Sequence, residues 1–287
     1  FVDLPSDQAE LEDAIDVVLT AQHDMDDLKV AVVTGINGKK VNAMMQNAET
    51  IEISGDGLKL ASLGLSDKAP ANIKIRRGAV IRVIKSNKDT WEIAQLPEVE
   101  GAFVALDPRT GEIKALVGGF DYNKNKFNHV TQAWRQPGSS FKPFIYSSSL
   151  EKGLSPATVI NDSPLFFDAS VTGGQPWEPK NYDGKFSGPM SMRTGLAKSK
   201  NMVSIRILKE VGPQNAQDWI TKFGFEAERH PPYLTMALGA GAVTPLQMAS
   251  AYSVFANGGF RVNPYLISKI TDHKGAVIAE TNPTALN

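Results

Sequence analysis

Short strand-like runs, separated by turn residues, fill the sequence between residues 28 and 97 and constrain its fold more than any other feature. Such runs are rich in β-branched residues, which indicates strands, and the glycine-rich clusters at 35–38 and 55–57 are typical of turns. Closely spaced strands of this kind favour a small all-β barrel over a helical domain. The strands are predicted at 29–33, 40–45, 50–53, 80–84 and 90–96.

The region before these strands has a different texture. Residues 1–27 are acidic, and apolar residues recur at helical spacing within 10–21, which predicts one amphipathic helix in an acidic linker segment. We therefore predict an acidic helical linker over 1–27 and an OB-like β domain over 28–97. The apolar positions of the helix are Leu11, Ala14, Ile15 and Val18.

A second domain is predicted over residues 98–287. It opens with two strand-like runs around the turn Asp107–Gly111 and ends with two more around Asp272–Gly275. Helical patterns lie between these hairpins, which indicates an α+β fold in which helices pack on an antiparallel sheet. The helices are predicted at 139–152, 190–200, 202–211, 214–223 and 245–257.

Composition excludes several classes of function. The 287 residues include 30 basic and 31 acidic side chains, and this balance argues against a nucleic-acid-binding protein. The sequence has no cysteine, and its four histidines stand far apart, so we expect no metal site and no cofactor. No apolar run approaches the roughly 18 residues of a membrane span, so any membrane anchor is expected outside these residues.

The motif Ser-x-x-Lys occurs twice, at Ser139–Lys142 and at Ser149–Lys152. A lysine one helical turn after a serine can take the hydroxyl proton and so activate the oxygen as a nucleophile. Pro137 and Gly138 predict that Ser139 stands at a helix start, where the dipole favours a neutral amine. Lys152, in contrast, precedes Gly153 at a predicted helix end, which is an ordinary position for a lysine. We therefore select the first pair.

Ser199-Lys200-Asn201 lies sixty residues further on, between two predicted helices. A hydroxyl can relay a proton and a carboxamide can bind a substrate amide, although Asn201 could equally be a simple helix cap. Two short motifs in this order indicate an acyl-transfer site more strongly than either motif alone.

Five segments resemble the transpeptidase domain of class A penicillin-binding proteins, the bifunctional peptidoglycan synthases of bacteria, and they occur in the order of that family. The region 28–98 is similar to the OB-type insertion of Gram-negative members. The resemblance implies the penicillin-binding/β-lactamase-like fold for the second domain. The five segments lie at 103–122, 127–146, 177–189, 196–203 and 237–259.

The resemblance implies a role for each matching residue. Ser139 is implied as the acylated nucleophile and Lys142 as its general base. Ser199 is implied as a proton-shuttling hydroxyl, and Asn201 as a ligand of the substrate's side-chain amide. Three further residues are implied to border the substrate cleft: Trp177, Asn181 and Tyr182.

The implied activity is cross-linking of peptidoglycan by a D,D-transpeptidase that β-lactam antibiotics acylate. Its partners are stem peptides ending in D-Ala-D-Ala and an activator protein at the OB-like domain, and its place is the periplasmic face of the inner membrane. A glycosyltransferase domain and an anchor are expected elsewhere in the protein. The family's third motif, Lys-Thr-Gly, is absent from the 287 residues, so we expect the second domain to be incomplete at its C-terminus.

Two alternative functions remain open from the sequence. A D,D-carboxypeptidase or a β-lactamase uses the same serine but transfers the acyl group to water. A noncatalytic binding module, in which the OB-like domain docks a partner, needs no reactive serine at all. The rate of deacylation separates transpeptidase from hydrolase, and covalent labelling by penicillin separates both enzymes from the binding module.

Overall fold

A computed structural model describes residues 1–172, 174–283 and 285–286 of the chain. It divides into two compact units, Phe1–Glu100 and a second unit that begins at Gly101. The domain boundary predicted near residue 97 lies close to this division. Among the described residues, every helix falls short of the length and apolarity that crossing a bilayer requires.

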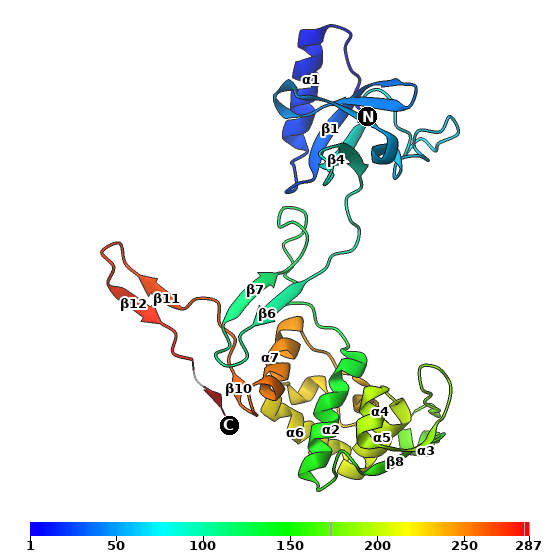
Figure 1. Ribbon diagram of the computed structural model, residues 1–287, viewed down its shortest axis with the longest axis vertical. Helices are drawn as coiled ribbons and strands as arrows, with labels where there is room; N and C mark the ends of the chain where they lie inside the picture. The colour runs from blue at the N-terminus through cyan, green and yellow to red at the C-terminus, as the bar shows by residue number, and fades with distance from the viewer. Residues whose placement is uncertain (173, 284, 287) are drawn as a thin grey trace. The chain divides into compact units, whose positions relative to one another are not determined.

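Unit 1 contains an antiparallel five-stranded sheet with the order β3-β2-β1-β4-β5. Figure 1 labels strands β1 and β4 of this sheet. All five predicted strands are present, and the predicted OB-like fold is confirmed by comparison below. The long strand β1 pairs with β4 over residues 29–32 and with β2 over residues 32–37, and the register with β2 shifts between Val33 and Gly35. The strands are β1 (Lys29–Asn37), β2 (Lys40–Met44), β3 (Thr50–Ser54), β4 (Val80–Lys85) and β5 (Trp91–Ala94).

Helix α1 (Gln8–Ala21) covers one face of this sheet. Asp7 caps it by accepting hydrogen bonds from the backbone amides of residues 9 and 10, which satisfies two free N–H groups of the first turn. The buried side chains Leu11, Ile15 and Leu19 pack on strands β1 and β2. The segment predicted as an acidic linker therefore contains a helix that belongs to the core of unit 1.

The opposite face of the sheet holds the larger core of unit 1. Val33, Val41, Ile53 and Val83 are all fully buried there. The short 3₁₀ helix η1 (Gln46–Ala48) connects β2 to β3, and η2 (Gly55–Leu58) follows β3. Gly57 lies so close to the backbone of Trp91 that a side chain at this position would clash.

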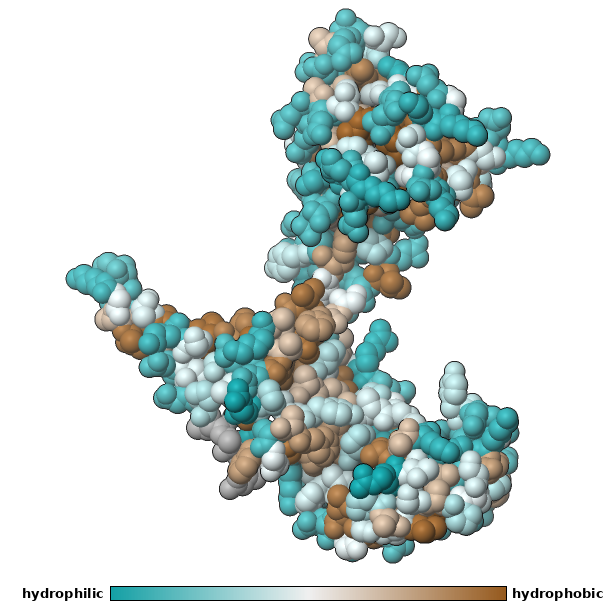
Figure 2. All heavy atoms as spheres, in the orientation of Figure 1, coloured by the Kyte–Doolittle hydropathy of each residue, from teal (hydrophilic) through white to brown (hydrophobic). Residues whose placement is uncertain are grey.

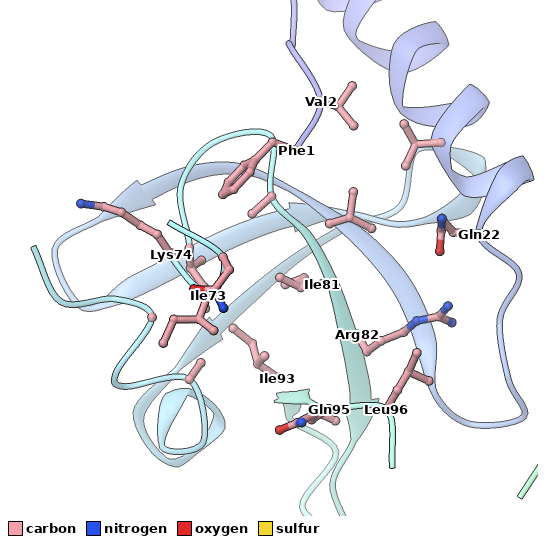
Figure 3. Close-up of a pocket in the computed structure, with 18 of the residues that line it drawn as sticks. Phe1, Val2, Gln22, Ile73, Lys74, Ile81, Arg82, Ile93, Gln95 and Leu96 are labelled. Atoms are coloured by element: carbon pink, nitrogen blue, oxygen red, sulfur yellow. The ribbon is translucent and has the colours of Figure 1, made fainter. Parts of the chain in front are cut away.

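Unit 1 also has a pocket of about 1250 Å³ (Figure 3). Its walls come from α1, from strands β4 and β5, and from the loop over residues 60–75. Most of the lining side chains are apolar, and the charged residues Lys74 and Arg82 also line the pocket. Ile73, Ile81 and Ile93 lie near one another in this pocket (Figure 3).

The core of unit 2 forms around helices α2 and α5, whose buried faces pack against each other. The longer predicted helices are all present in the structure. The helices are α2 (Lys142–Glu151), α3 (Ala169–Thr172), α4 (Met192–Ala197), α5 (Asn201–Val211), α6 (Pro213–Ile220) and α7 (Pro245–Ala256). Short 3₁₀ helices are η3 (Gly138–Phe141), η4 (Thr221–Phe223), η5 (Ala227–Arg229) and η6 (Leu234–Leu238).

The strands of unit 2 form antiparallel pairs. The hairpin of β6 and β7 packs on α7, in agreement with the predicted α+β arrangement. Its side chains Phe103 and Val117 are exposed, and Figure 2 shows hydrophobic side chains gathered over this hairpin. The predicted helix over 190–200 begins only at Met192, because the preceding residues pair with β8. The strands are β6 (Phe103–Leu106), β7 (Ile113–Val117), β8 (Val159–Asp162), β9 (Gly188–Ser191), β10 (Arg261–Val262), β11 (Lys269–Thr271), β12 (Val277–Glu280) and β13 (Ala285–Leu286).

Candidate active site

Ser139 lies in the 3₁₀ turn η3, immediately before α2, and its side chain is exposed. The chain forms a 3₁₀ turn here instead of a full α-helical turn because of the proline that follows. Pro143 has no N–H to continue the α-helical pattern, and the amide of Lys142 bonds instead to the Ser139 carbonyl in the tighter 3₁₀ manner. The predicted position at a helix start therefore holds, and the tight turn presents the hydroxyl to solvent.

Contacts from the far end of the sequence fix this turn. The hydroxyl of Tyr252, on α7, donates a 2.7 Å hydrogen bond to the Ser140 carbonyl, and the Gly138 amide donates to the Gly239 carbonyl at 3.2 Å. A side chain at residue 239 would collide with the Gly138 backbone, which explains the glycine. Backbone rigidity at a nucleophile preserves the geometry that a reaction needs.

The apolar support beneath the turn is aromatic. Phe141 is fully buried and stacks on the ring of His230, with 4.8 Å between ring centroids and an interplanar angle of 6°. Burial lowers the pKa of His230 to about 4, so this ring is neutral at physiological pH and packs like an aromatic side chain.

Lys142 is 0% exposed, and its ammonium reaches across to the segment between α4 and α5. It donates to the Ser199 carbonyl at 2.8 Å, to the Ser199 Oγ at 3.0 Å and to the Asn201 Oδ1 at 2.7 Å. An ammonium has three N–H bonds, and each of them has an acceptor here. Within the described residues, the Ser139 hydroxyl forms no hydrogen bond with this lysine, so the geometry fits the resting, protonated amine.

Burial lowers the pKa of Lys142 from its ordinary value of 10.5 to about 8. Desolvation disfavours the charged form of an amine, and none of the three acceptors carries a full negative charge to oppose it. A pKa of about 8 leaves roughly one lysine in ten neutral at pH 7. The neutral amine has a free lone pair and can accept a proton.

Ser199 and Asn201 are brought to Lys142 by an unusual backbone turn. Ser199 has φ 53°, in the left-handed region that a serine rarely adopts, and this conformation directs both its carbonyl and its hydroxyl at the same ammonium. Asn201 begins α5, and its Nδ2 donates to the Lys180 carbonyl at 2.8 Å, which orients the amide. The structure thus brings Lys142, Ser199 and Asn201 together.

The three residues predicted to border a cleft have different environments. The side chain of Tyr182 is fully exposed. Trp177 stacks on Phe167 with 5.5 Å between ring centroids, and the two backbones exchange hydrogen bonds. Asn181 is buried, and its amide bonds to Asp162, to the Lys185 carbonyl and to the Met202 amide. Asn181 therefore has hydrogen-bond partners within the protein, and the substrate-binding roles of Asn181, Tyr182 and Trp177 stay predictions.

The second Ser-x-x-Lys pair has an ordinary structural environment. Ser149 is fully buried, and its hydroxyl donates to the Tyr146 carbonyl at 2.7 Å. Lys152 is an exposed residue at the C-terminal cap of α2. Neither side chain lies in a position to act as nucleophile or base.

Sequence reasoning missed two groups that shape the site. One is Tyr252, which lies within the helix predicted over 245–257 but was not expected to contact the Ser139 turn. The other is the ion pair of Lys200 with Asp162, in which the ammonium lies 3.5 Å from Oδ2. The position of Lys200 between Ser199 and Asn201 was the available signal, but no spacing rule identifies a carboxylate nearly forty residues earlier as its partner.

Comparison with known proteins identifies both units. Residues 101–287 match the family model described as the penicillin-binding protein transpeptidase domain, and residues 1–99 match the penicillin-binding protein OB-like domain. Penicillin-binding protein 1A of Neisseria lactamica is 43% identical over 284 residues, 99% of this chain and 35% of that protein. The corresponding protein of Pseudomonas aeruginosa is 39% identical over 272 residues, 92% of this chain and 33% of that protein. The chain thus spans about a third of the length of these relatives.

Solved structures agree with this assignment. Penicillin-binding protein 1A from Haemophilus influenzae superposes with a TM-score of 0.87 at 34% identity, over 99% of this chain and 40% of that one. PonA1 from Mycobacterium tuberculosis in complex with penicillin V gives a TM-score of 0.56 at 26% identity, over 64% of this chain and 51% of that one. The predicted fold of both units is confirmed.

Proposed function

Because this chain belongs to the penicillin-binding protein transpeptidase family, we propose that it cross-links peptidoglycan through an acyl-enzyme on Ser139. Ser139 Oγ attacks the carbonyl of the penultimate D-Ala, and Lys142 takes the hydroxyl proton. The amide bond to the terminal D-Ala breaks, that residue leaves with a proton, and an ester remains on Ser139. The amine of a second stem peptide then attacks the ester, which forms the cross-link and returns the hydroxyl.

The environment of Lys142 is the observation that supports this proposal best. The lysine is buried, and its three hydrogen-bond acceptors carry no full charge. An amine with a pKa of about 8 can receive a proton at physiological pH, whereas an exposed lysine cannot do so efficiently. Ser199 Oγ, 3.0 Å from the Lys142 ammonium, is suited to pass that proton towards the leaving group. Asn201 keeps its Oδ1 on the lysine and its Nδ2 on a backbone carbonyl, so we propose that it orients the site and meets the substrate at its edge.

β-Lactam antibiotics fit the same step. Opening of the lactam amide by Ser139 gives an ester, but the ring nitrogen stays tethered to the acyl group and does not depart. The complex of the relative PonA1 with penicillin V supports binding of this class of compound to the present chain.

The fate of the acyl group distinguishes transpeptidation from hydrolysis. We expect the full-length protein, given a peptide ending in D-Ala-D-Ala and a second peptide with a free side-chain amine, to form the cross-linked product. Mass spectrometry quantifies this product against the hydrolysed peptide. Hydrolysed peptide alone, at every amine concentration, would support the carboxypeptidase alternative, and failure to label with penicillin would support the binding module.

The rate of acylation should depend on pH through Lys142. Below the pKa of about 8 the neutral fraction of this amine rises about tenfold per pH unit, and above it the neutral form predominates. We therefore expect the rate constant for acylation by penicillin to increase steeply from pH 6 to pH 8 and then to level off. Stopped-flow measurements across this range test the point, and a constant rate between pH 6 and pH 9 would contradict it.

Other parts of the activity belong to the whole protein. We propose that it also polymerises glycan strands and that it works at the periplasmic face of the inner membrane, as its family resemblance implies. A strand with the Lys-Thr-Gly motif is proposed to come from outside these residues. The pocket of unit 1 is the surface that we propose for the activator protein.

A further inference from the structure

A buried ion pair lies directly behind the Ser199–Asn201 turn. The side chain of Lys200 is only 9% exposed, and its ammonium lies 3.5 Å from Oδ2 of Asp162 and 3.7 Å from Oδ2 of Asp183. Asp162 is fully buried. Lys200 lies between Ser199 and Asn201, the two residues that contact the Lys142 ammonium. Its own side chain reaches Asp162, while its backbone connects Ser199 to Asn201.

Asp162 is itself held rigidly. It ends strand β8, where it pairs with Gly188 of β9. Its Oδ1 accepts a 2.7 Å hydrogen bond from Asn181 Nδ2, and its Oδ2 accepts one of 2.8 Å from the Ser187 amide. The carboxylate therefore connects a strand pair to the ammonium of Lys200 and has little freedom to move.

The turn that this pair holds is a strained one. A left-handed φ of 53° at Ser199 persists only where the surroundings enforce it. The Lys200 amide donates to the Gly195 carbonyl at 2.9 Å, and its side chain is anchored at Asp162, so this residue is tied at both ends. On the other flank, the Met202 amide donates to Asn181 Oδ1 at 3.3 Å. The same network thus holds the backbone on both sides of Asn201.

The energetics favour a geometric role for this ion pair over a stabilising one. Burying two opposite charges costs desolvation energy that their attraction only partly offsets, and apolar replacements are often as stable. A buried pair directly behind three reactive residues is therefore better explained by the geometry it maintains. Arg206, which bonds to the Ser163 carbonyl nearby, already anchors the neighbouring loop without contacting the turn.

We propose that Lys200 and Asp162 are positioning residues, which hold Ser199 and Asn201 against Lys142 in the geometry for acylation. This inference rests on the proposed acyl transfer by Ser139. Asn181 belongs to the same device, because it links the Asp162 carboxylate to the first turn of α5.

The test compares Lys200→Met, Asp162→Asn and the double variant in the full-length protein, with fluorescent penicillin as the probe. Lys209→Met is the matched control, because this lysine is exposed in the last turn of α5, away from the ion pair, and the substitution is the same. A misplaced turn should slow acylation by about 100-fold in each single variant and leave the control unchanged. In the double variant no buried charge is unpaired, so Tm should recover towards wild type while acylation stays slow.

A second readout separates positioning from folding. Hydrogen-bond acceptors favour the charged form of an amine, so loss of Ser199 and Asn201 from Lys142 should move the acidic limb of the rate profile to lower pH. Two results would overturn the proposal. One is an acylation rate that recovers together with Tm in the double variant. The other is an unchanged pH dependence of the acylation rate, with only the fraction of protein that penicillin labels reduced. Wild-type protein that penicillin does not label would instead overturn the proposed function itself.

Discussion

Ser139→Ala protein is expected to form no covalent adduct with fluorescent penicillin, because the exposed hydroxyl that we propose as the nucleophile is then gone. The neighbouring Ser140 hydroxyl donates to the Pro137 carbonyl at 2.7 Å and is not expected to replace it. Loss of the nucleophilic serine in a serine protease, which also forms an acyl-enzyme, lowers kcat about 10⁶-fold, and a comparable loss here would be far below detection on a gel. The exposed position of the residue predicts little change in Tm.

Ser149→Ala is the control for this experiment. Ser149 belongs to the second Ser-x-x-Lys pair, and its buried hydroxyl bonds only to a helix carbonyl. Labelling should therefore persist in this variant at the wild-type rate. Equal labelling of the Ser139→Ala protein and the wild type would rule out Ser139 as the nucleophile.

Lys142→Met should produce the second large effect. Methionine keeps an unbranched apolar stem in the core but removes the amine, and a positioned general base contributes about 10²- to 10⁴-fold to a rate. We expect acylation to slow by that amount and the remaining rate to lose its rise between pH 6 and pH 8. Rates come from a time course of labelling.

Lys152→Met gives the matched control, because it makes the same substitution at an exposed helix cap. Its rate and its pH profile should equal those of the wild type. If the Lys142→Met protein still showed the rise in acylation rate between pH 6 and pH 8, the titrating group would be a different residue. If it acylated at the wild-type rate, Lys142 would not be the base.

The sheet of unit 1 was predictable because its pattern is local. Runs such as 29–33 and 80–84 are rich in β-branched residues and end at turn residues, so each strand is encoded within a few positions. The packing of α1 was less accessible. Its acidic surface suggested a linker, and only the three-dimensional sheet reveals an apolar face for Leu11, Ile15 and Leu19 to cover.

Strands β8 and β9 show where local patterns fail. β9 contains Gly188 and Pro189, which are poor strand formers, and it forms because β8 offers a partner. Asp162 at the end of β8 meets Lys200 only through this pairing. The candidate pair Ser139 and Lys142 could be found from its spacing together with the helix-start signal of Pro137 and Gly138, whereas the ion pair behind it depends on contacts between distant segments.

Mass spectrometry of the penicillin-labelled protein after digestion tests the central claim most directly. The account predicts one modified peptide, with the penicilloyl mass on Ser139 and none on Ser149. Modification of any other residue, with Ser139 unmodified, would contradict it.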